Sequence, residues 1–173
     1  MLDKTFVQLC KEIKFEFDEQ QFYGAKVLSV ESNLNEWKFK IAFANHIDIE
    51  QYKQFREKLV KRFGKVELIL AIETIIRNKQ IIVDYLNYLI ECNPKKYWPF
   101  VKYNYSCITT STIEIDEKTL TLSLLTNEIY EVFKSNKDLF KEALASIGFD
   151  FYNVVFNLGL NNKKSVASKK LDG

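Results

Sequence analysis

The spacing of apolar residues at the start of the chain predicts a helix followed by two strands. Apolar residues recur at helical spacing over residues 3–14, and Asp3 is a suitable residue to cap that helix. Residues 22–31 predict a strand. Residues 37–44 predict a second strand because every other side chain is apolar. The sequence SNLNE between these two segments indicates the turn that joins them.

The next helix is the most clearly marked element of the sequence. Asp48 can cap it, with Gln51 at the third helical position as the reciprocal partner. Gly64 stands where a left-handed residue commonly ends a helix. The apolar stripe of this helix consists of Tyr52, Phe55, Leu59 and Phe63. Residues 66–72 then alternate and predict a third strand.

The second half of the chain predicts a similar succession of elements. A helix that is apolar almost all round covers residues 80–92, and Asn93-Pro94 ends it because the residue before proline disfavours helical geometry. The sequence KKYWPFVKYNY predicts a short aromatic helix after it. The later elements are a hairpin of residues 107–115 and 118–125, a long helix over residues 127–147 closed by Gly148, and a strand over residues 151–158.

This order of elements predicts an α+β fold made of two similar ββαβ-type lobes with extra helices. We expect a first lobe over residues 1–78 with the order α-ββαβ. A second lobe over residues 79–160 has the order αα-ββαβ. The polar, Lys-rich sequence of residues 161–173 shows no periodicity, which is typical of a disordered tail or a linker.

Composition narrows the classes of function. Hydrophobic residues make up 47% and charged residues 28% of the 173 residues, as in a globular protein. A formal net charge of +2 provides no global field that would draw the chain to nucleic acid or to an anionic membrane. The three cysteines match no zinc or redox pattern and suit a reducing compartment. No apolar run approaches about 20 residues, so we expect a cytoplasmic protein without membrane contact.

The sequence offers little material for catalysis. His46, the single histidine, precedes Asp48 and Glu50. This grouping allows a metal site, an acid–base pair or a solvent-facing loop residue beside a helix cap. We interpret His46 as the loop residue, because no further His or Cys is spaced to complete a metal site. No phosphate-binding glycine loop, serine elbow or HExxH sequence is present. We therefore expect no catalytic residue, no metal ligand and no cofactor in this chain.

Two kinds of surface remain as binding candidates. The apolar helix and the aromatic segment after it carry more hydrophobic residues than a small lobe needs, which favours a protein-docking surface. The candidate partner-binding residues are Ile81, Tyr85, Leu86, Tyr97, Trp98 and Phe100. The alternative is a single-stranded nucleic-acid-binding module over residues 95–103, where cations and aromatics are interleaved. Its candidate contacts are Lys95, Lys96 and Lys102. A solvated basic face is the interpretation for Lys58, Lys61, Arg62 and Lys65.

Several stretches of the sequence, taken in order, resemble a known family. They are the strand Trp37-Lys38-Phe39-Lys40-Ile41, the helix with Tyr52, Phe55, Leu59 and Phe63, the helix start Asp84-Tyr85, the strand Leu120-Thr121-Leu122-Ser123-Leu124, and the helix end Ile147-Gly148-Phe149. Together they resemble the N-terminal region of the PolC-type alpha subunit of bacterial DNA polymerase III. The resemblance covers about residues 1–160.

The resemblance implies a specific place in DNA replication. In that family this region precedes an OB domain, a 3′–5′ exonuclease and the polymerase domains, so the active sites would lie outside this chain. The region would dock replisome proteins, notably the tau subunit of the clamp loader, and would be joined to the remainder of the polymerase chain. The second lobe would resemble a KH fold without its phosphate clamp. This agrees with the absence of any GXXG sequence here.

Overall fold

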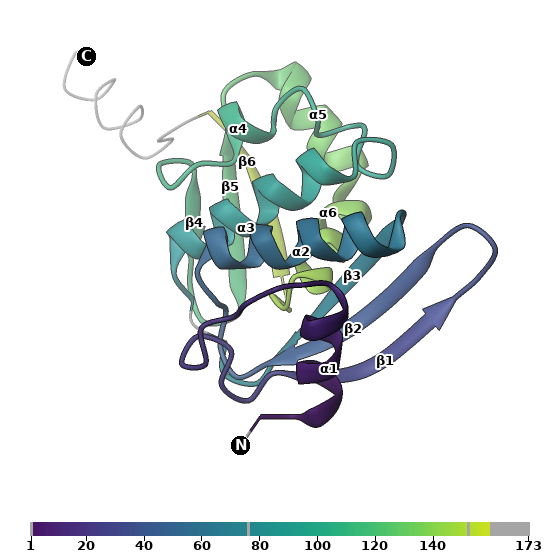
Figure 1. The fold of residues 1–173 in the computed structure, drawn as a ribbon. Coiled ribbons are helices and arrows are strands. Elements are labelled where there is room, and N and C mark those ends of the chain that lie inside the picture. Colours follow the sequence, from purple (N-terminus) through teal and green to yellow (C-terminus); the bar gives the residue numbers. More distant parts are fainter. Residues whose placement is uncertain (1, 76, 152, 160–173) are drawn as a thin grey trace, which may run out of the picture. The chain divides into compact units, whose positions relative to one another are not determined.

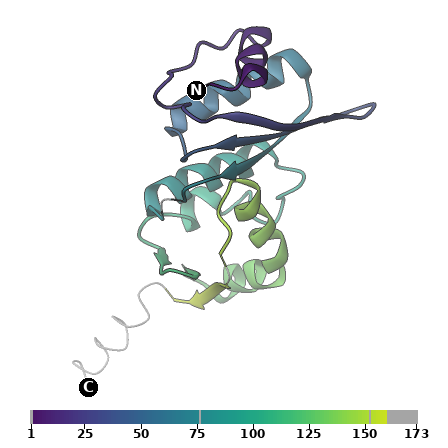
Figure 2. The same ribbon diagram turned by 90° about the horizontal axis from the view of Figure 1, so that it is seen from below.

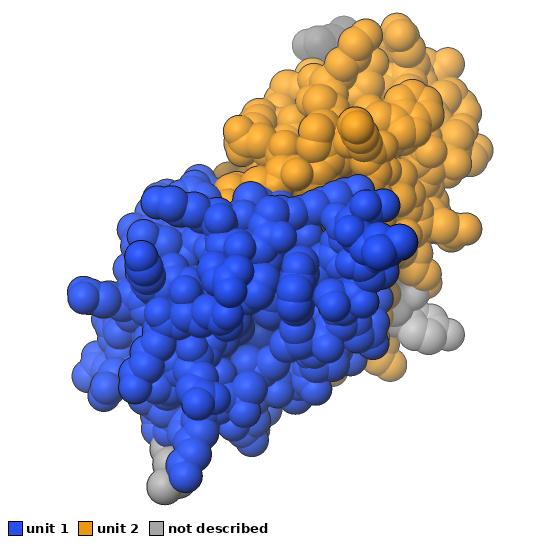
Figure 3. Space-filling model, turned by 45° about the vertical axis from the view of Figure 1, so that its right-hand side comes forward, with its two compact units in different colours: residues 1–76, 146–149 blue, residues 77–145, 150–173 orange. Residues whose placement is uncertain are grey.

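The chain divides into two compact units, each with its own sheet. The computed structural model describes residues 2–75, 77–151 and 153–159. Unit 1 comprises residues 1–76 and 146–149, and unit 2 comprises residues 77–145 and 150–173 (Figure 3). The predicted tail over residues 161–173 lies outside the described residues. Both units combine helices with a three-stranded mixed sheet, which confirms the predicted α+β class.

Unit 1 is built as α-ββαβ, as the sequence predicts. Its elements in order are α1 (Lys4–Glu12), β1 (Lys26–Ser32), β2 (Trp37–Phe43), α2 (Ile49–Phe63) and β3 (Val66–Ile72) (Figure 1). Strand β2 lies in the centre of the sheet, antiparallel to β1 and parallel to β3. Helices α1 and α2 lie on the same face of this sheet (Figure 2).

The core of unit 1 fills the space between these helices and the sheet. Alternation in β2 buries Phe39, Ile41 and Phe43 on the helix side, since successive strand residues point to opposite faces. Phe22 is a central ring of this core, with its centroid 5.8 Å from that of Phe6 on α1 and 5.6 Å from that of Phe43. Full burial of such a side chain stabilises the fold by about 1.5–3 kcal/mol. The helix face of the sheet therefore carries the main core of this unit.

The two helix caps of unit 1 agree with the sequence in part. The carboxylate of Asp3 accepts a hydrogen bond of 3.1 Å from the backbone N–H of Phe6, as predicted. Asp48 likewise caps α2 by accepting from the backbone N–H of Glu50 at 3.2 Å. The reciprocal partner is different, however. The side-chain oxygen of Gln21 accepts from the backbone N–H of Asp48 at 3.0 Å, in place of the predicted Gln51.

The first strand starts later than predicted. It begins at Lys26, whereas the sequence placed its start at residue 22. The reason is a turn in which the carboxylate of Asp18 accepts from the backbone N–H of Gln20 at 2.8 Å, and the backbone carbonyl of Asp18 accepts from Phe22 at 3.0 Å. Phe22 therefore enters the core from a turn and not from a strand.

In the described part of unit 2, two helices precede the first strand, and two more lie between the second and third strands in the chain. Its elements in order are α3 (Lys79–Cys92), α4 (Asn104–Cys107), β4 (Ile113–Ile115), β5 (Thr119–Leu124), α5 (Asn127–Ser135), α6 (Lys137–Ser146) and β6 (Asn153–Leu158). Strand β5 is central, antiparallel to β4 and parallel to β6. The two sheets thus share one topology, which agrees with the predicted similarity of the lobes. The KH-like character of the second lobe stays a prediction.

Three predictions for unit 2 were wrong in detail. The first strand of the hairpin, predicted over residues 107–115, is only β4 (Ile113–Ile115), because residues 107–112 form the end of α4 and the turns after it. The aromatic segment over residues 95–103 forms turns and not a helix, and the short helix α4 begins only at Asn104. The long helix predicted over residues 127–147 is two helices that meet at Asn136. There the side-chain amide of Asn136 donates to the carbonyl of Val132 at 2.7 Å, and its backbone N–H donates to Phe133 at 3.1 Å. These bonds end α5, because a short polar side chain can replace the next helical hydrogen bond.

Gly148 has no room for a side chain. Its φ is +85°, and an added Cβ would lie 2.3 Å from Cγ1 of Ile72, which belongs to the same unit. Gly64, at the end of α2, has a similar φ of +87° but no atom within 4 Å of an added Cβ. A side chain at Gly64 would therefore cause backbone strain alone, whereas one at Gly148 would cause both strain and steric overlap.

We predict that Gly148→Ala lowers the free energy of unfolding by about 3 kcal/mol, since strain and overpacking add. The matched change Gly64→Ala should cost less, about 1–2 kcal/mol, because only the backbone strain applies. Urea unfolding followed by circular dichroism measures both values. Equal losses in the two variants would contradict the packing described for Gly148.

Candidate docking groove in unit 1

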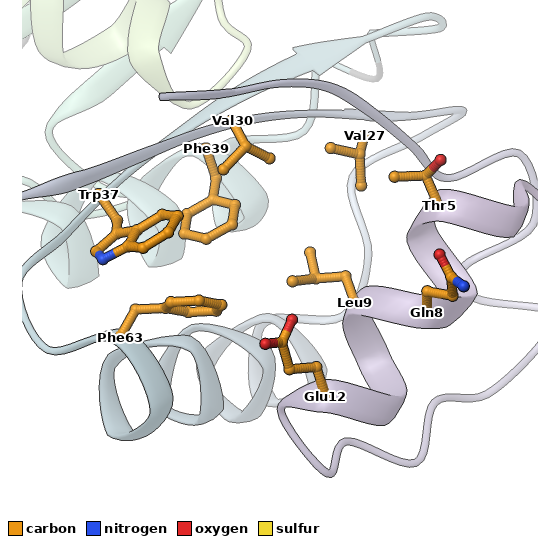
Figure 4. Close-up of a pocket in the computed structure, with 9 residues that line it drawn as sticks. All are labelled: Thr5, Gln8, Leu9, Glu12, Val27, Val30, Trp37, Phe39 and Phe63. Atoms are coloured by element: carbon orange, nitrogen blue, oxygen red, sulfur yellow. The ribbon is translucent and has the colours of Figure 1, made fainter. Parts of the chain in front are cut away.

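An apolar groove of about 480 Å³ lies in unit 1, between α1, the β1–β2 hairpin and the end of α2. Figure 4 shows the side chains around it, with the rings of Trp37 and Phe63 facing α1 across the groove. The lining residues are Thr5, Gln8, Leu9, Glu12, Val27, Val30, Trp37, Phe39 and Phe63. Helix α1, β1, β2 and α2 thus all contribute.

Three aromatic rings form the floor of the groove. The ring centroid of Trp37 lies 4.8 Å from that of Phe63 and 6.2 Å from that of Phe39, and the Phe39–Phe63 separation is 5.1 Å. Phe39 is fully buried, whereas Trp37 and Phe63 are half-buried. Trp37 is the first residue of β2 and Phe63 the last of α2, so both stand at ends of elements where the core thins out. The groove therefore exposes aromatic surface on a rigid base.

Helix α1 supplies the opposite wall. Thr5, Gln8, Leu9 and Glu12 are spaced three and four residues apart, which places them on one helix face. Leu9 adds apolar surface, and the other three add hydrogen-bonding groups. Of the described residues that line the groove, Glu12 alone is charged. Its carboxylate pairs with Arg62 at 2.9 Å, and the Arg62 guanidinium lies 5.0 Å from the centre of the Phe63 ring.

The groove is suited to recognition of a side chain rather than to bond chemistry. Clustered aromatic residues beside a few polar groups are typical of protein-binding hot spots. Over residues 2–75, 77–151 and 153–159, no group of His, Cys, Asp and Glu side chains could hold a metal ion. Burial raises the pKa of the nearby Cys10 thiol to about 12, so this thiol is protonated at neutral pH and is a poor nucleophile.

Most of the partner-binding residues predicted in unit 2 are core residues. Tyr85, Leu86, Tyr97 and Phe100 are at most 1% exposed, so their side chains hold the unit together and offer no docking surface. The prediction for these four was wrong because an all-round apolar helix is also what a buried helix requires. Ile81 is half-buried. Trp98 is 72% exposed and remains available to a partner.

The predicted nucleic-acid contacts lie at the surface. Lys95, Lys96 and Lys102 are all exposed. Lys96 pairs with Glu142 at 3.0 Å and lies over the ring of Tyr97, with 5.5 Å between its Nζ and the ring centre. Lys96 thus contacts a buried ring, and Trp98 is the exposed tryptophan of the same segment. Whether they bind nucleic acid stays a prediction.

The interpretation of His46 as a solvent-facing residue was wrong. Its side chain is 9% exposed, and its ring stacks on that of Phe149 with a centroid distance of 4.1 Å. The Nε2–H group donates to the carbonyl of Ile147 at 2.7 Å. Burial lowers the pKa of His46 below its ordinary value of 6.5, and the hydrogen bond to Ile147 opposes this effect only in part. His46 is therefore a structural residue of unit 1.

The groove itself was missed in the sequence. Trp37, Phe39 and Phe63 were identified there as apolar positions of a strand and a helix, but nothing showed that two of them remain accessible. The positions of Trp37 and Phe63 are a usable signal. A bulky aromatic residue at the start of a strand or the end of a helix lies at the margin of the core, where its ring can stay partly exposed.

Part of the chain matches a known protein family. Residues 5–74 match the protein family described as DNA polymerase III polC-type N-terminus I. This range contains every residue that lines the groove. No curated protein matches the chain. Among the described residues, no helix has the length and apolar character needed to cross a membrane.

His46 gives a test of the core of unit 1. Because its pKa is lowered in the folded state, the folded protein favours the neutral ring, and stability is complete above the unfolded-state pKa of 6.5. We predict that stability falls as the pH drops from 6.5 toward the folded-state pKa, and that His46→Gln flattens this dependence. Since His46 is the single histidine, its ring proton shift in NMR measures the pKa directly. A folded-state value above 6.5 would contradict the buried position.

Proposed function

We propose that this chain is a non-catalytic docking part of a replicative DNA polymerase, because residues 5–74 match the family described as DNA polymerase III polC-type N-terminus I. The observation that carries this proposal is the aromatic groove of unit 1, which lies wholly inside the matched residues. The polymerase and exonuclease chemistry of such an enzyme then belongs to other parts of the polymerase, and this chain binds other replisome proteins in the bacterial cytoplasm.

The groove has the features that a transient docking site needs. Trp37 supplies a large ring held by Phe39 and Phe63, and a tryptophan of this kind is among the residues most enriched in binding hot spots. Few charges have to be desolvated, because Glu12 already has Arg62 as its partner. The tau subunit of the clamp loader is the partner we propose, as the family resemblance implies.

We predict that Trp37→Ala weakens tau binding about thirtyfold, which corresponds to about 2 kcal/mol for the loss of a hot-spot tryptophan. The matched control is Trp98→Ala, which removes the other tryptophan of the chain from the exposed segment of unit 2. This control should leave the affinity unchanged. Isothermal titration calorimetry with purified tau measures both, and thermal unfolding shows that each variant is folded.

The outcomes separate the two docking surfaces. No heat with the unchanged chain at tens of micromolar would argue against tau as the partner. A large loss with Trp98→Ala and none with Trp37→Ala would move the docking site to the aromatic segment of unit 2, where the sequence alone placed it.

A second candidate function rests on the exposed part of that segment. Trp98 is 72% exposed, and exposed Lys95 and Lys102 lie near it in sequence. A cation-flanked aromatic ring can stack on a base of single-stranded nucleic acid. Because Tyr97 and Phe100 are buried, neither can stack on a base, which makes this surface smaller than the sequence suggested.

We expect labelled oligo-dT to show no binding to the chain by fluorescence anisotropy at physiological salt, because one aromatic ring and a few lysines give too small a surface. A matched pair tests the alternative directly. Binding that weakens steeply with salt and disappears in Trp98→Ala, but not in Trp37→Ala, would establish the nucleic-acid function instead.

A further inference from the structure

Strand β1 forms one edge of the sheet in unit 1. The strand order β1-β2-β3 leaves one side of β1 without a neighbouring strand among the described residues. The β1–β2 hairpin extends beyond the helices at its turn end (Figure 1). Unpaired edges of this kind are templates for pairing with another chain, and proteins normally cover or shorten them.

The free backbone groups of this edge can be assigned from the pairing. The backbone N–H of Asn33 donates to Glu36 at 3.0 Å and closes the hairpin. Because hydrogen-bonded and free residues alternate along an antiparallel strand, Val30 and Ser32 direct their N–H and C=O groups to the outer edge. Neither has a backbone partner there among the described residues.

The start of the strand is already covered. The N–H of Val27 donates to the carboxylate of Asp3, at 3.4 Å, so the N-terminus of α1 occupies this part of the edge. The pairing then shifts at a bulge between Val27 and Ser29. A new strand could therefore pair only along residues 29–32. The open edge is short and lies next to the hairpin turn.

This open edge and the groove are continuous. Val30 lies opposite Phe39 in the β1–β2 pairing, so both side chains point to the same face of the sheet, and both line the groove. Val30 is 45% exposed. In a strand added beside β1, every second side chain would point to this face and into the groove (Figure 4). Backbone pairing and side-chain insertion can thus occur together.

The charges define the chemistry of the added strand. Glu31, between Val30 and Ser32, points to the other face, where Lys38 of β2 lies opposite it in the strand pairing. Glu31 forms no ion pair among the described residues, so its carboxylate can still pair with a basic side chain on the outer side. Glu12 is the charged group of the groove wall. A basic side chain next to Glu31 on the added strand would form a favourable cross-strand pair, whereas an acidic one would be repelled.

We propose that β1 is a strand-addition site, at which residues 29–32 pair with an extended peptide segment of the partner protein. The segment alternates bulky apolar side chains, which enter the groove beside Trp37 and Phe63, with basic side chains that face Glu31. The backbone bonds supply affinity and the groove selects the apolar residues. This inference rests on the proposed docking function and specifies how the partner is bound.

A second copy of this chain fits the edge less well. Pairing Val30 of one copy with Ser32 of the other would place Glu31 opposite Glu31, and like charges in that position are destabilising. Pairing Val30 with Val30 would place Leu28 of one copy opposite Ser32 of the other. Leu28 lies at the bulge, where the regular strand geometry is interrupted. The partner segment is therefore the occupant that the edge favours.

The test uses the full chain labelled with ¹⁵N and the blocked peptide acetyl-Ser-Leu-Lys-Trp-Lys-Leu-Ser-amide. The control peptide has the same composition with the alternation broken, Ser-Lys-Lys-Trp-Leu-Leu-Ser. We expect the first peptide to slow hydrogen exchange of the Val30 and Ser32 amides at least about tenfold. The control should bind about tenfold more weakly or not at all.

A pair of variants isolates the backbone bond. Val30→Pro removes an N–H that faces outward, which an edge strand tolerates, and Val30→Ala removes only the side-chain contact. Val30→Pro should weaken peptide binding about tenfold more than Val30→Ala. Circular dichroism of both variants checks the fold, and the exchange measurement on the unchanged chain stands independently if the proline variant unfolds.

Each outcome bears on one proposal. No peptide binding up to about 1 mM, binding without protection of Val30 and Ser32, or a dimer of the free chain paired through β1 in sedimentation would overturn the strand-addition site. Tau binding that leaves the Val30 and Ser32 amides unprotected would overturn strand addition as the mode of binding but would keep the docking function. Peptide binding at the edge without tau binding would keep the site and overturn the proposed partner.

Discussion

Unit 1 depends on how its two helices cover one apolar face of a three-stranded sheet. Strand β2 has seven residues and spans about 23 Å, whereas the nine residues of α1 span about 13 Å. Helix α1 therefore covers only part of the sheet. The uncovered part lies at the hairpin end, where Trp37 and Phe63 remain half-buried. The groove lies in this part of unit 1.

The same constraint explains why groove and open edge coincide. The carboxylate of Asp3, the cap of α1, accepts hydrogen bonds from the backbone N–H of Phe6 in its own helix and of Val27 on the edge strand. This one carboxylate therefore fixes the start of α1 against the start of β1. Beyond the bulge, no strand pairs with the outer side of β1 among the described residues. Exposed aromatic rings and free backbone groups thus occur side by side within residues 5–74, the segment that matches the PolC-type family.

The fold could be predicted from the sequence largely because alternation and capping are local. The burial of Phe39, Ile41 and Phe43 follows from a spacing of two residues, and the cap at Asp3 from one side chain. Interactions between distant segments could not be predicted in this way. Gln21 bonds to Asp48 across 27 positions, and His46 is buried by its contact with Ile147, 101 positions away. The candidate site was misplaced for the same reason, since apolar residues such as Tyr85 and Phe100 look alike in sequence whether they are buried or exposed.

The central claim is that a replisome partner binds to the groove of unit 1, and the two tryptophans of the chain allow a direct test. In a ¹⁵N NMR spectrum each tryptophan gives one indole N–H signal, one from the groove and one from unit 2. On addition of tau, the account predicts that the Trp37 signal shifts or broadens while the Trp98 signal stays in place. A change confined to the Trp98 signal would contradict it.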